Sequence, residues 1–178
     1  MKVPIIKCKR ITLRPLSVKD ANIFISWFRD KEVTKYLILQ KAPSLRNEIK
    51  WIKDRIKSKE NYVWSMLNEN NQLVGNIDIR YNYVNHVGNF GIVIGDKQSW
   101  GLGYGAEAFE AIIAFAFKKL KCNRVDLFVY AGNGRAKKLY KKLGFVYEGK
   151  QRQRYFNLIT KKFEDSEIYS ILRQEYKK

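Results

Sequence analysis

The chain has 178 residues, 46% of them hydrophobic and 29% charged, which is enough for one domain with a sizeable core. The longest apolar run, AIIAFAF at 111–117, is too short to span a membrane, and the start lacks the apolar stretch of a signal peptide, so we expect a cytoplasmic protein. Cys8, Cys122 and the single histidine, His86, offer little material for a disulfide framework or a metal site. The formal net charge of +18 favours anionic partners, or simply keeps the protein soluble.

The first half of the chain predicts one strand, two helices and a three-stranded meander. Residues 11–16 (ITLRPL) read as a strand, and Ser17 with Asp20 has the spacing of a helix-capping box. Apolar residues at helical spacing predict the helix that follows, and a second helix from Ser44 to Ser58. The strands of the meander are expected at NYVWSML (61–67), LVGNIDIRYNY (73–83) and NFGIVIG (89–95).

The second half predicts two helices and three strands. A helix is expected from about Ala106 to Leu120, followed by the strand RVDLFVY (124–130). The helix GRAKKLYKKL comes next and ends before Gly144, where glycine suits a helix C-terminus. The segments FVYEGKQRQRYF (145–156) and FEDSEIYSIL (163–172) read as a closing antiparallel pair. This order indicates a mixed α/β fold rather than a regular βαβ repeat.

Three glycines alternate directly before the helix expected at Ala106, in the stretch QSWGLGYGAEA (98–108). Glycines in such a pattern are typical of a backbone with positive φ angles, or of a backbone that a ligand approaches closely. The stretch also satisfies a dinucleotide-binding fingerprint, but the preceding strand belongs to a meander and Asp126 lies inside its strand, so that context is wrong. We therefore expect an anion site for a phosphate or pyrophosphate at the helix N-terminus. A glycine turn without a ligand is the alternative.

Two motifs carry a resemblance to a known family. QSWGLGYGAEA resembles the Q-x-x-G-x-G/A acyl-CoA motif of the GNAT acetyltransferase superfamily, and NGRAKKLYKKLGF (133–145) resembles its second signature, N-x-x-A-x-x-L-Y-x-K-x-G-F. One helix and one strand separate them, as in the family. ITLRPLSVKDA (11–21) and WFRDKEVTKYL (27–37) are similar to the RimJ/RimL-type branch. The resemblance implies a single GNAT-like α/β domain over 1–178, with a central, mostly antiparallel sheet, a splayed strand pair and flanking helices.

The resemblance implies acetyl-CoA as cosubstrate and no metal. Gln98 and the glycine backbone would hold the pyrophosphate, the strand at 90–94 would bond the pantetheine arm, and Arg135 would reach the 3′-phosphate. The implied cofactor-binding residues are Ile92, Val93, Ile94, Gln98, Gly101, Leu102, Gly103, Tyr104, Gly105, Ala106 and Asn133.

Tyr140 matches the tyrosine that the family uses to protonate the departing thiolate, and a phenol, with a pKa near ~10, is protonated at neutral pH. By itself such a tyrosine could equally be a core aromatic. Asn89 stands where many RimJ/RimL-type chains have a glutamate, and an amide cannot act as a base. His86, Asp78 or Glu148 acting through water, or bulk solvent, would take the proton. We expect direct attack by the amine, with strand N–H groups stabilising the oxyanion and no covalent intermediate.

The predicted function is transfer of an acetyl group from acetyl-CoA to a primary amine on a small molecule or a peptide. The basic C-terminal part disfavours a polycation and mildly favours an anionic acceptor, so a protein N-terminus or a nucleotide-linked amino sugar is expected. A homodimer through the final strands also fits this branch. The alternative is a nucleic-acid-binding protein on a catalytically silent scaffold, in which basic clusters with Tyr140, Tyr155 and Phe156 contact phosphates and stack on bases.

Overall fold

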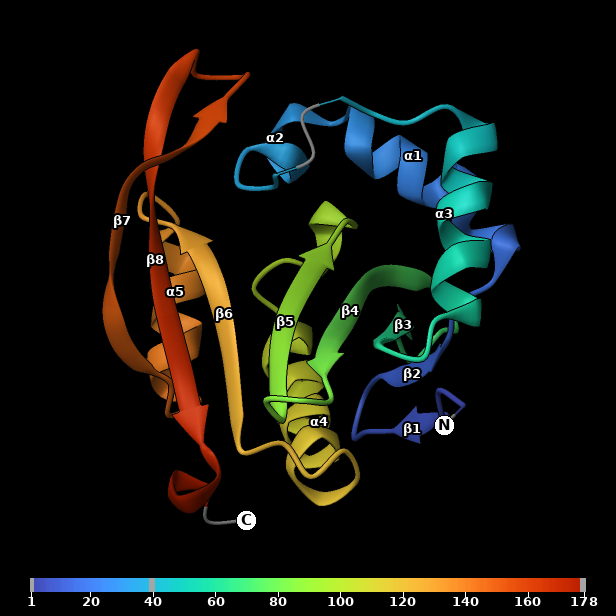
Figure 1. Ribbon diagram of the computed structural model, residues 1–178. Coiled ribbons are helices and arrows are strands. Elements are labelled where there is room, and N and C mark those ends of the chain that lie inside the picture. Colours follow the sequence, from blue (N-terminus) through green and yellow to red (C-terminus); the bar gives the residue numbers. More distant parts are fainter. Residues whose placement is uncertain (1, 39–40, 177–178) are drawn as a thin grey trace.

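Eight strands form one sheet in the computed structural model, which describes residues 2–38 and 41–176 (Figure 1). The sheet order is β1-β2-β3-β4-β5-β6-β8-β7. The strands are β1 (Ile6–Lys7), β2 (Thr12–Pro15), β3 (Asn61–Leu67), β4 (Leu73–Asn82), β5 (Val87–Ile94), β6 (Arg124–Tyr130), β7 (Val146–Asn157) and β8 (Lys162–Leu172). The helices of the described residues are α1 (Ala21–Arg29), α2 (Lys31–Thr34), α3 (Leu45–Lys57), α4 (Tyr104–Lys118) and α5 (Gly134–Lys142), with short 3-10 turns at Val18–Asp20, Lys97–Ser99 and Arg173–Glu175.

The sheet is antiparallel except between β5 and β6, which run parallel. These two strands pair only from Val87, opposite Arg124, to Asn89, opposite Asp126. Beyond that point they diverge toward the side of the molecule where α2 lies (Figure 1). The mostly antiparallel sheet with a splayed strand pair, expected from the family resemblance, is confirmed.

A polar bridge marks the point where the two strands separate. Asn89 Nδ2 donates a hydrogen bond of 2.9 Å to Asp126 Oδ1, and Arg124 Nε lies 3.1 Å from Asp126 Oδ2. Arg80 Nη2 lies 3.3 Å from Asn89 Oδ1 on the other side of the bridge. The Asn89 amide therefore joins β5 to β6 at the last paired position.

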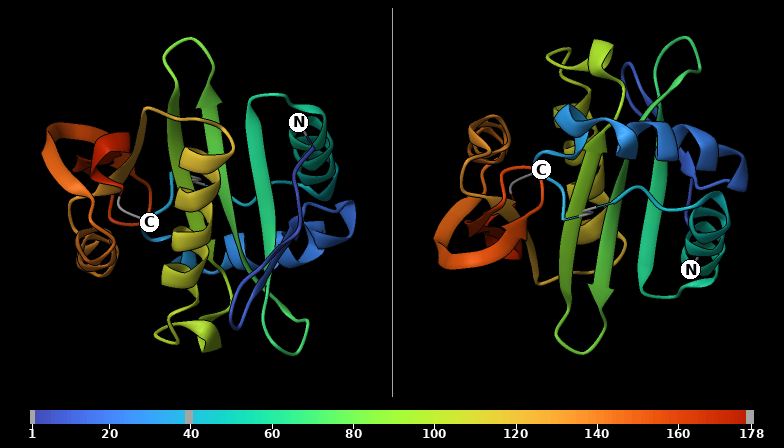
Figure 2. Two further views of the ribbon diagram at one scale, coloured as in Figure 1. Left: turned by 90° about the horizontal axis from the view of Figure 1, so that it is seen from below. Right: turned by 90° about the horizontal axis from the view of Figure 1, so that it is seen from above.

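The helices cover opposite faces of the sheet. Figure 2 shows α4 lying across β4 and β5 and α5 beside β7 and β8. The apolar side of α4, with Phe109 and Ile112 fully buried, packs against Ile77 and Ile79 of β4 in the larger core cluster. The helices α1 and α3 pack against β3 in a second cluster around Phe24 and Ile52, together with Val63. Side chains alternate along a strand, so residues of β4 between the core isoleucines face α1 and α3.

The predicted elements are present, with differences at their ends. The helix expected from about Ala106 begins at Tyr104 and ends at Lys118, because the positive φ angle of Gly103 places the N-cap two residues earlier. Ser17 and Asp20 form the predicted capping box, but it opens a 3-10 turn that leads into α1. Neither α2 nor the two-residue β1 was expected, since elements this short leave no periodic pattern in the sequence.

The Asp20 carboxylate should contribute strongly to stability, because it is 3% exposed and holds together the start of α1, β2 and β3. It lies 2.6 Å from both Arg14 Nη2 and Ser65 Oγ. Burial alone would raise the pKa of Asp20, but the hydrogen bonds from Arg14 and Ser65 outweigh it and lower that pKa. We expect Asp20→Asn to lower the free energy of unfolding by about 3 kcal/mol at pH 7 in urea titrations.

A carboxylate with a depressed native pKa stabilises the fold above its unfolded pKa of about 4, and this stabilisation is lost as the pH falls through the native value. The difference between wild type and Asp20→Asn should therefore shrink at pH 3. Asp54→Asn, on the exposed side of α3, is the control and should change stability by less than about 0.5 kcal/mol. If Asp20→Asn lowered the free energy of unfolding equally at pH 7 and pH 3, the stabilising role assigned to the Asp20 charge would be contradicted.

Candidate active site

The gap between β5 and β6 is bordered by backbone groups that no neighbouring strand covers. The N–H group of Gly95 donates to the Val74 carbonyl oxygen at 3.0 Å, so the odd-numbered residues of β5 direct their backbone polar groups toward β4. By alternation, the even-numbered residues of β5 face β6, and the Phe90 N–H group still lies at the last paired position. Beyond it, the C=O group of Phe90, both polar groups of Ile92 and the N–H group of Ile94 point toward the gap. An extended ligand between the strands can therefore bond to β5 as a further strand would.

The glycine stretch forms a tight turn that ends at the N-terminus of α4. Gly101 and Gly103 have φ angles of 84° and 88°, which side chains rarely adopt, whereas Gly105 lies in the first helical turn. The N–H groups of Tyr104 and Gly105 have no acceptor within the helix, and they lie at the positive end of its dipole. Arg10 adds a cation beside the turn, since its Nη1 donates to the Leu102 carbonyl oxygen at 2.8 Å.

The gap and the turn open into one cavity of about 1370 Å³, with walls from the five helices and from β4 to β7. All the predicted cofactor residues line it except Gln98 and Leu102, which are exposed and lie outside this lining. The side chain of Tyr104 is buried and donates to Glu69 Oε2 at 2.6 Å, so only its backbone is free for a ligand. The predicted residues in the wall are Ile92, Val93, Ile94, Gly101, Gly103, Tyr104, Gly105, Ala106 and Asn133.

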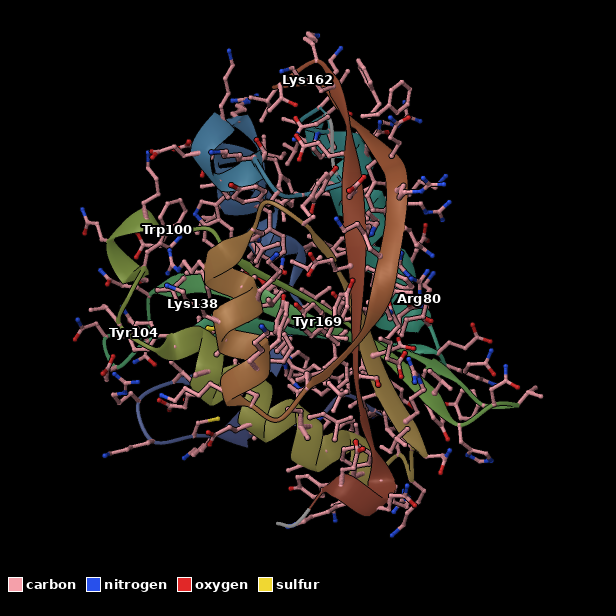
Figure 3. All side chains as sticks on the ribbon, turned by 90° about the vertical axis from the view of Figure 1, so that its left-hand side faces the viewer. Arg80, Trp100, Tyr104, Lys138, Lys162 and Tyr169 are labelled. Carbon is pink, nitrogen blue, oxygen red and sulfur yellow. The ribbon has the colours of Figure 1, made fainter. Side chains whose placement is uncertain are left out.

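A cation and a second helix N-terminus face the same end of the cavity. The guanidinium of Arg135 lies over the ring of Trp100, 5.3 Å from its centroid. Trp100 Nε1 donates to the Ile94 carbonyl oxygen at 2.8 Å, which holds the indole at the end of β5. Asn133 caps α5 by accepting the Ala136 N–H at 3.1 Å. Figure 3 shows Trp100 and Tyr104 on the same side of the molecule as α5, so this end suits a phosphate-rich ligand.

Tyr140 lies in the cavity wall on the face covered by α4 and α5. It is 6% exposed and packs against Phe109, Phe145 and Tyr169, with ring centroids 5.4 to 6.1 Å away. Burial raises the pKa of Tyr140 well above its ordinary value, so its phenol stays protonated at neutral pH. The hydroxyl forms no hydrogen bond with any described residue, which leaves its proton available to a ligand in the cavity.

Asp78 lines the cavity from the other face of the sheet. Both of its chain neighbours face the core beneath α4, so its own side chain faces α1 and α3. It pairs across the strands with Gly91, where an added Cβ would lie 2.6 Å from Asp78 Oδ1, so only glycine leaves room for the carboxylate. Burial raises the pKa of Asp78 to about 7, although the charges of Arg55 and Arg80 oppose this.

The other two residues considered as bases lie outside the cavity lining. His86 Nδ1 lies 2.8 Å from the Tyr81 hydroxyl at the tip of the β4–β5 hairpin. Glu148 Oε1 accepts a hydrogen bond of 2.6 Å from Arg124 Nη1, and this pairing lowers the pKa of Glu148 to about 2. A carboxylate that stays ionised in an ion pair is a poor proton acceptor near pH 7. Among the three, the geometry favours Asp78.

Two residues in the wall were missed by sequence reasoning. Glu48 precedes Ile52 by four residues, so it falls on the buried stripe of α3, and a carboxylate at such a position was the available signal. Trp100 lies inside the glycine stretch, and nothing in the local sequence predicts its bond to β5. Within 2–38 and 41–176, the structure contains no group of three acidic, histidine or cysteine side chains placed to hold a metal ion, and no helix long and apolar enough to cross a membrane.

A sheet that opens between two parallel strands, beside a glycine turn and the start of a long helix, defines the acetyltransferase class. The family model described as "Acetyltransferase (GNAT) domain" matches residues 10–146, so the chain belongs to the GNAT acetyltransferase family. It is an acetyl-CoA-dependent N-acetyltransferase. The expected alternative of a silent nucleic-acid-binding scaffold is therefore set aside.

Similar proteins support the same assignment. The uncharacterized N-acetyltransferase p20 of Bacillus licheniformis is 27% identical over 173 residues, covering 94% of this chain and 96% of its own. A crystal structure described as a probable acetyltransferase has 25% identity and a TM-score of 0.86, covering 97% of this chain and 99% of its own. The spermidine N-acetyltransferase from Vibrio cholerae, solved with CoA and spermine, shares the fold with a TM-score of 0.87 at 21% identity, covering 94% and 98%.

Proposed function

We propose that the gap between β5 and β6 binds the pantetheine arm of acetyl-CoA and that the glycine turn binds its pyrophosphate. The observation that carries this proposal is the position where strand pairing ends, since it leaves backbone groups of β5 uncovered directly before two positive-φ glycines. The residues that would hold the cosubstrate are those of the wall named above, with Arg135 near the 3′-phosphate. Gln98 and Leu102 remain part of the proposal at the outer edge of the turn.

Tyr140 and Asp78 would then move the two protons of the reaction. Acetyl-CoA supplies a thioester that a neutral amine attacks directly. Asp78 would take a proton from the incoming ammonium group, a role suited to a carboxylate with a pKa near neutrality. Tyr140, whose phenol is protonated, would give its proton to the departing sulfur, and the proton that the attacking nitrogen loses as the amide forms would restore the phenol. The N–H group of Ile92, which points into the gap, would stabilise the developing oxyanion.

The acceptor is proposed to be a primary amine, and candidates come from two sources. The sequence favoured a protein N-terminus or a nucleotide-linked amino sugar, whereas the Vibrio cholerae neighbour is described as a spermidine N-acetyltransferase. We also propose that residues 1–178 form one domain of the RimJ/RimL-type branch and that the domain works in the cytoplasm, where the free thiols Cys8 and Cys122 stay reduced. A homodimer through the final strands completes the proposal.

Calorimetric titration of acetyl-CoA tests the cosubstrate site, with NAD as the competing ligand. Wild type should bind acetyl-CoA at micromolar Kd and should not bind NAD. Gly103→Val should raise the Kd roughly tenfold or more, because a valine resists a φ of 88° and its Cβ would lie 3.2 Å from Arg10 Nη2.

The matched control for that titration is Gly134→Ala, where an added Cβ meets no atom within 4 Å. This variant should bind acetyl-CoA within about twofold of wild type. Failure of folded wild type to bind acetyl-CoA would refute the proposed site.

A further inference from the structure

One carboxylate in the cavity wall has no role in the proposed reaction and no partner among the described residues. Glu48 of α3 is 4% exposed, and its Oε1 atom is buried without a hydrogen bond to any residue of 2–38 or 41–176. Neither oxygen of this carboxylate forms an ion pair with any described residue, yet Glu48 lines the same cavity as Asp78. An acidic group buried in this way is costly unless a ligand compensates it.

Apart from Asp78, the proposed base, the other charged side chains of the wall already have partners among the described residues. Glu32 accepts from Lys97 Nζ at 2.7 Å, and Arg80 is within 3.3 Å of Asn89 and close enough to Asp78 to act on its charge. The remaining cations of the wall lie over aromatic rings, at 5.2 to 5.6 Å from the centroids: Lys35 over Tyr36, Arg135 over Trp100 and Arg154 over Tyr155. Glu48 is therefore, apart from Asp78, the carboxylate of this wall that has no cation paired with it among the described residues.

Around Glu48 the wall is made of groups that suit an alkyl chain. Trp51 follows it by three residues on α3 and also lines the cavity, as do Phe28 and Val33 of the neighbouring helices. The strand β4 contributes Asp78, the proposed base, to the lining of the same cavity. One carboxylate near the reacting amine and a second, uncompensated one on α3 would match a molecule with two cationic ends and an apolar middle.

We propose that Glu48 is a specificity-determining residue that binds a second ammonium group of the acceptor, so that the acceptor class is an aliphatic diamine or a longer amine with two separated positive charges. This inference rests on the proposed function, since it places the reacting amine of the same molecule beside Asp78. It opposes an anionic acceptor, which would bring a negative charge next to Glu48.

Three matched acceptors test this on wild-type protein without any substitution. They are 1,4-diaminobutane, butylamine and 4-aminobutanoate, which share one primary amine and differ in the charge at the far end. Acetyl-CoA turnover, followed by release of the free CoA thiol, should give kcat/KM at least tenfold higher for the diamine than for butylamine, and lowest for the amino acid. A series from 1,3-diaminopropane to 1,8-diaminooctane would locate the preferred spacing.

Glu48→Gln then tests the residue itself, because it keeps the size and removes the charge. We expect kcat/KM for the diamine to fall about tenfold, mainly through KM, while the rate with butylamine and the Kd for acetyl-CoA stay within twofold. Asp54→Asn removes a charge from the exposed side of the same helix and should leave all three values unchanged.

The outcomes separate this inference from the proposed function. Three results would overturn the role of Glu48 in a protein that does bind acetyl-CoA. They are equal turnover of diamine and monoamine, a preference for 4-aminobutanoate, and no turnover of any diamine. A diamine preference that survives in Glu48→Gln would do the same. Absence of acetyl-CoA binding to wild type would instead refute the site proposed for the cosubstrate.

Discussion

Replacing Tyr140 by phenylalanine should lower kcat by roughly 10² to 10³-fold, because a positioned general acid contributes about that much to proton transfer. The ring packing against Phe109 and Phe145 is retained in this variant, and only the hydroxyl is lost. The Kd for acetyl-CoA should stay within about twofold, since in the proposed mechanism the phenol acts on the leaving sulfur and not on the phosphates. Steady-state kinetics and calorimetry on the same preparation would measure both quantities.

Tyr169→Phe is the matched control for this experiment. Tyr169, which is labelled in Figure 3, lies in the same aromatic cluster, 6.1 Å from Tyr140 between ring centroids. It is outside the cavity wall, and its hydroxyl donates to Glu167 at 2.9 Å. Its loss should cost about 1 kcal/mol of stability and leave kcat within about threefold. If both variants lost the same activity, the effect of Tyr140→Phe would be structural and its role as an acid would be refuted.

Asp78→Asn should lower kcat/KM by about 10²-fold at pH 7.5 and should also change the pH profile. A general base acts when it is ionised, so wild-type kcat/KM should rise with pH through about 7, the pKa to which burial raises Asp78. The variant should lack that step. Initial rates between about pH 5.5 and 9, with acetyl-CoA saturating, would provide the profile.

Stability gives an independent check on Asp78. Its native pKa is above that of the unfolded chain, so the native state binds more protons between about pH 4 and 7 and loses stability as the pH rises through this range. Asp78→Asn removes that cost and should be at least as stable as wild type at pH 8. The control for the pH profile is Glu148→Gln, a change outside the cavity, which should keep the rise of kcat/KM near pH 7. If this rise persisted in Asp78→Asn, it would belong to another titrating group.

The parts of the site that depend on local sequence could be predicted. The glycine turn, the helix that follows it and the position of Tyr140 on α5 all come from short motifs, in which backbone angle and helical spacing are set by near neighbours. The start of α4 was misplaced by two residues, since an alternating glycine pattern does not reveal which glycine takes the N-cap.

The choice of base could not be predicted, because it depends on which elements pack together. From sequence, His86, Asp78 and Glu148 were equivalent candidates. Only the pairing of β4 with β5 and the packing of α3 on that face show that Asp78 reaches the cavity, while Arg124 occupies Glu148. Glu48 was missed for the same reason, since its environment comes from residues far away in the chain.

The polar bridge of Asn89 and Asp126 also marks how far β5 and β6 pair before they separate. Because each residue of a strand advances about 3.3 Å, an extra pair of rungs between β5 and β6 would move the fork between them by about 7 Å. In the proposed complex, the thioester would then no longer lie between Tyr140 on one face of the sheet and Asp78 on the other. The position of this fork thus sets the distance available to the cosubstrate arm in the proposed complex. We therefore expect Asn89 and Asp126 to be harder to replace by strand-forming apolar residues than any single residue of the proposed cosubstrate site.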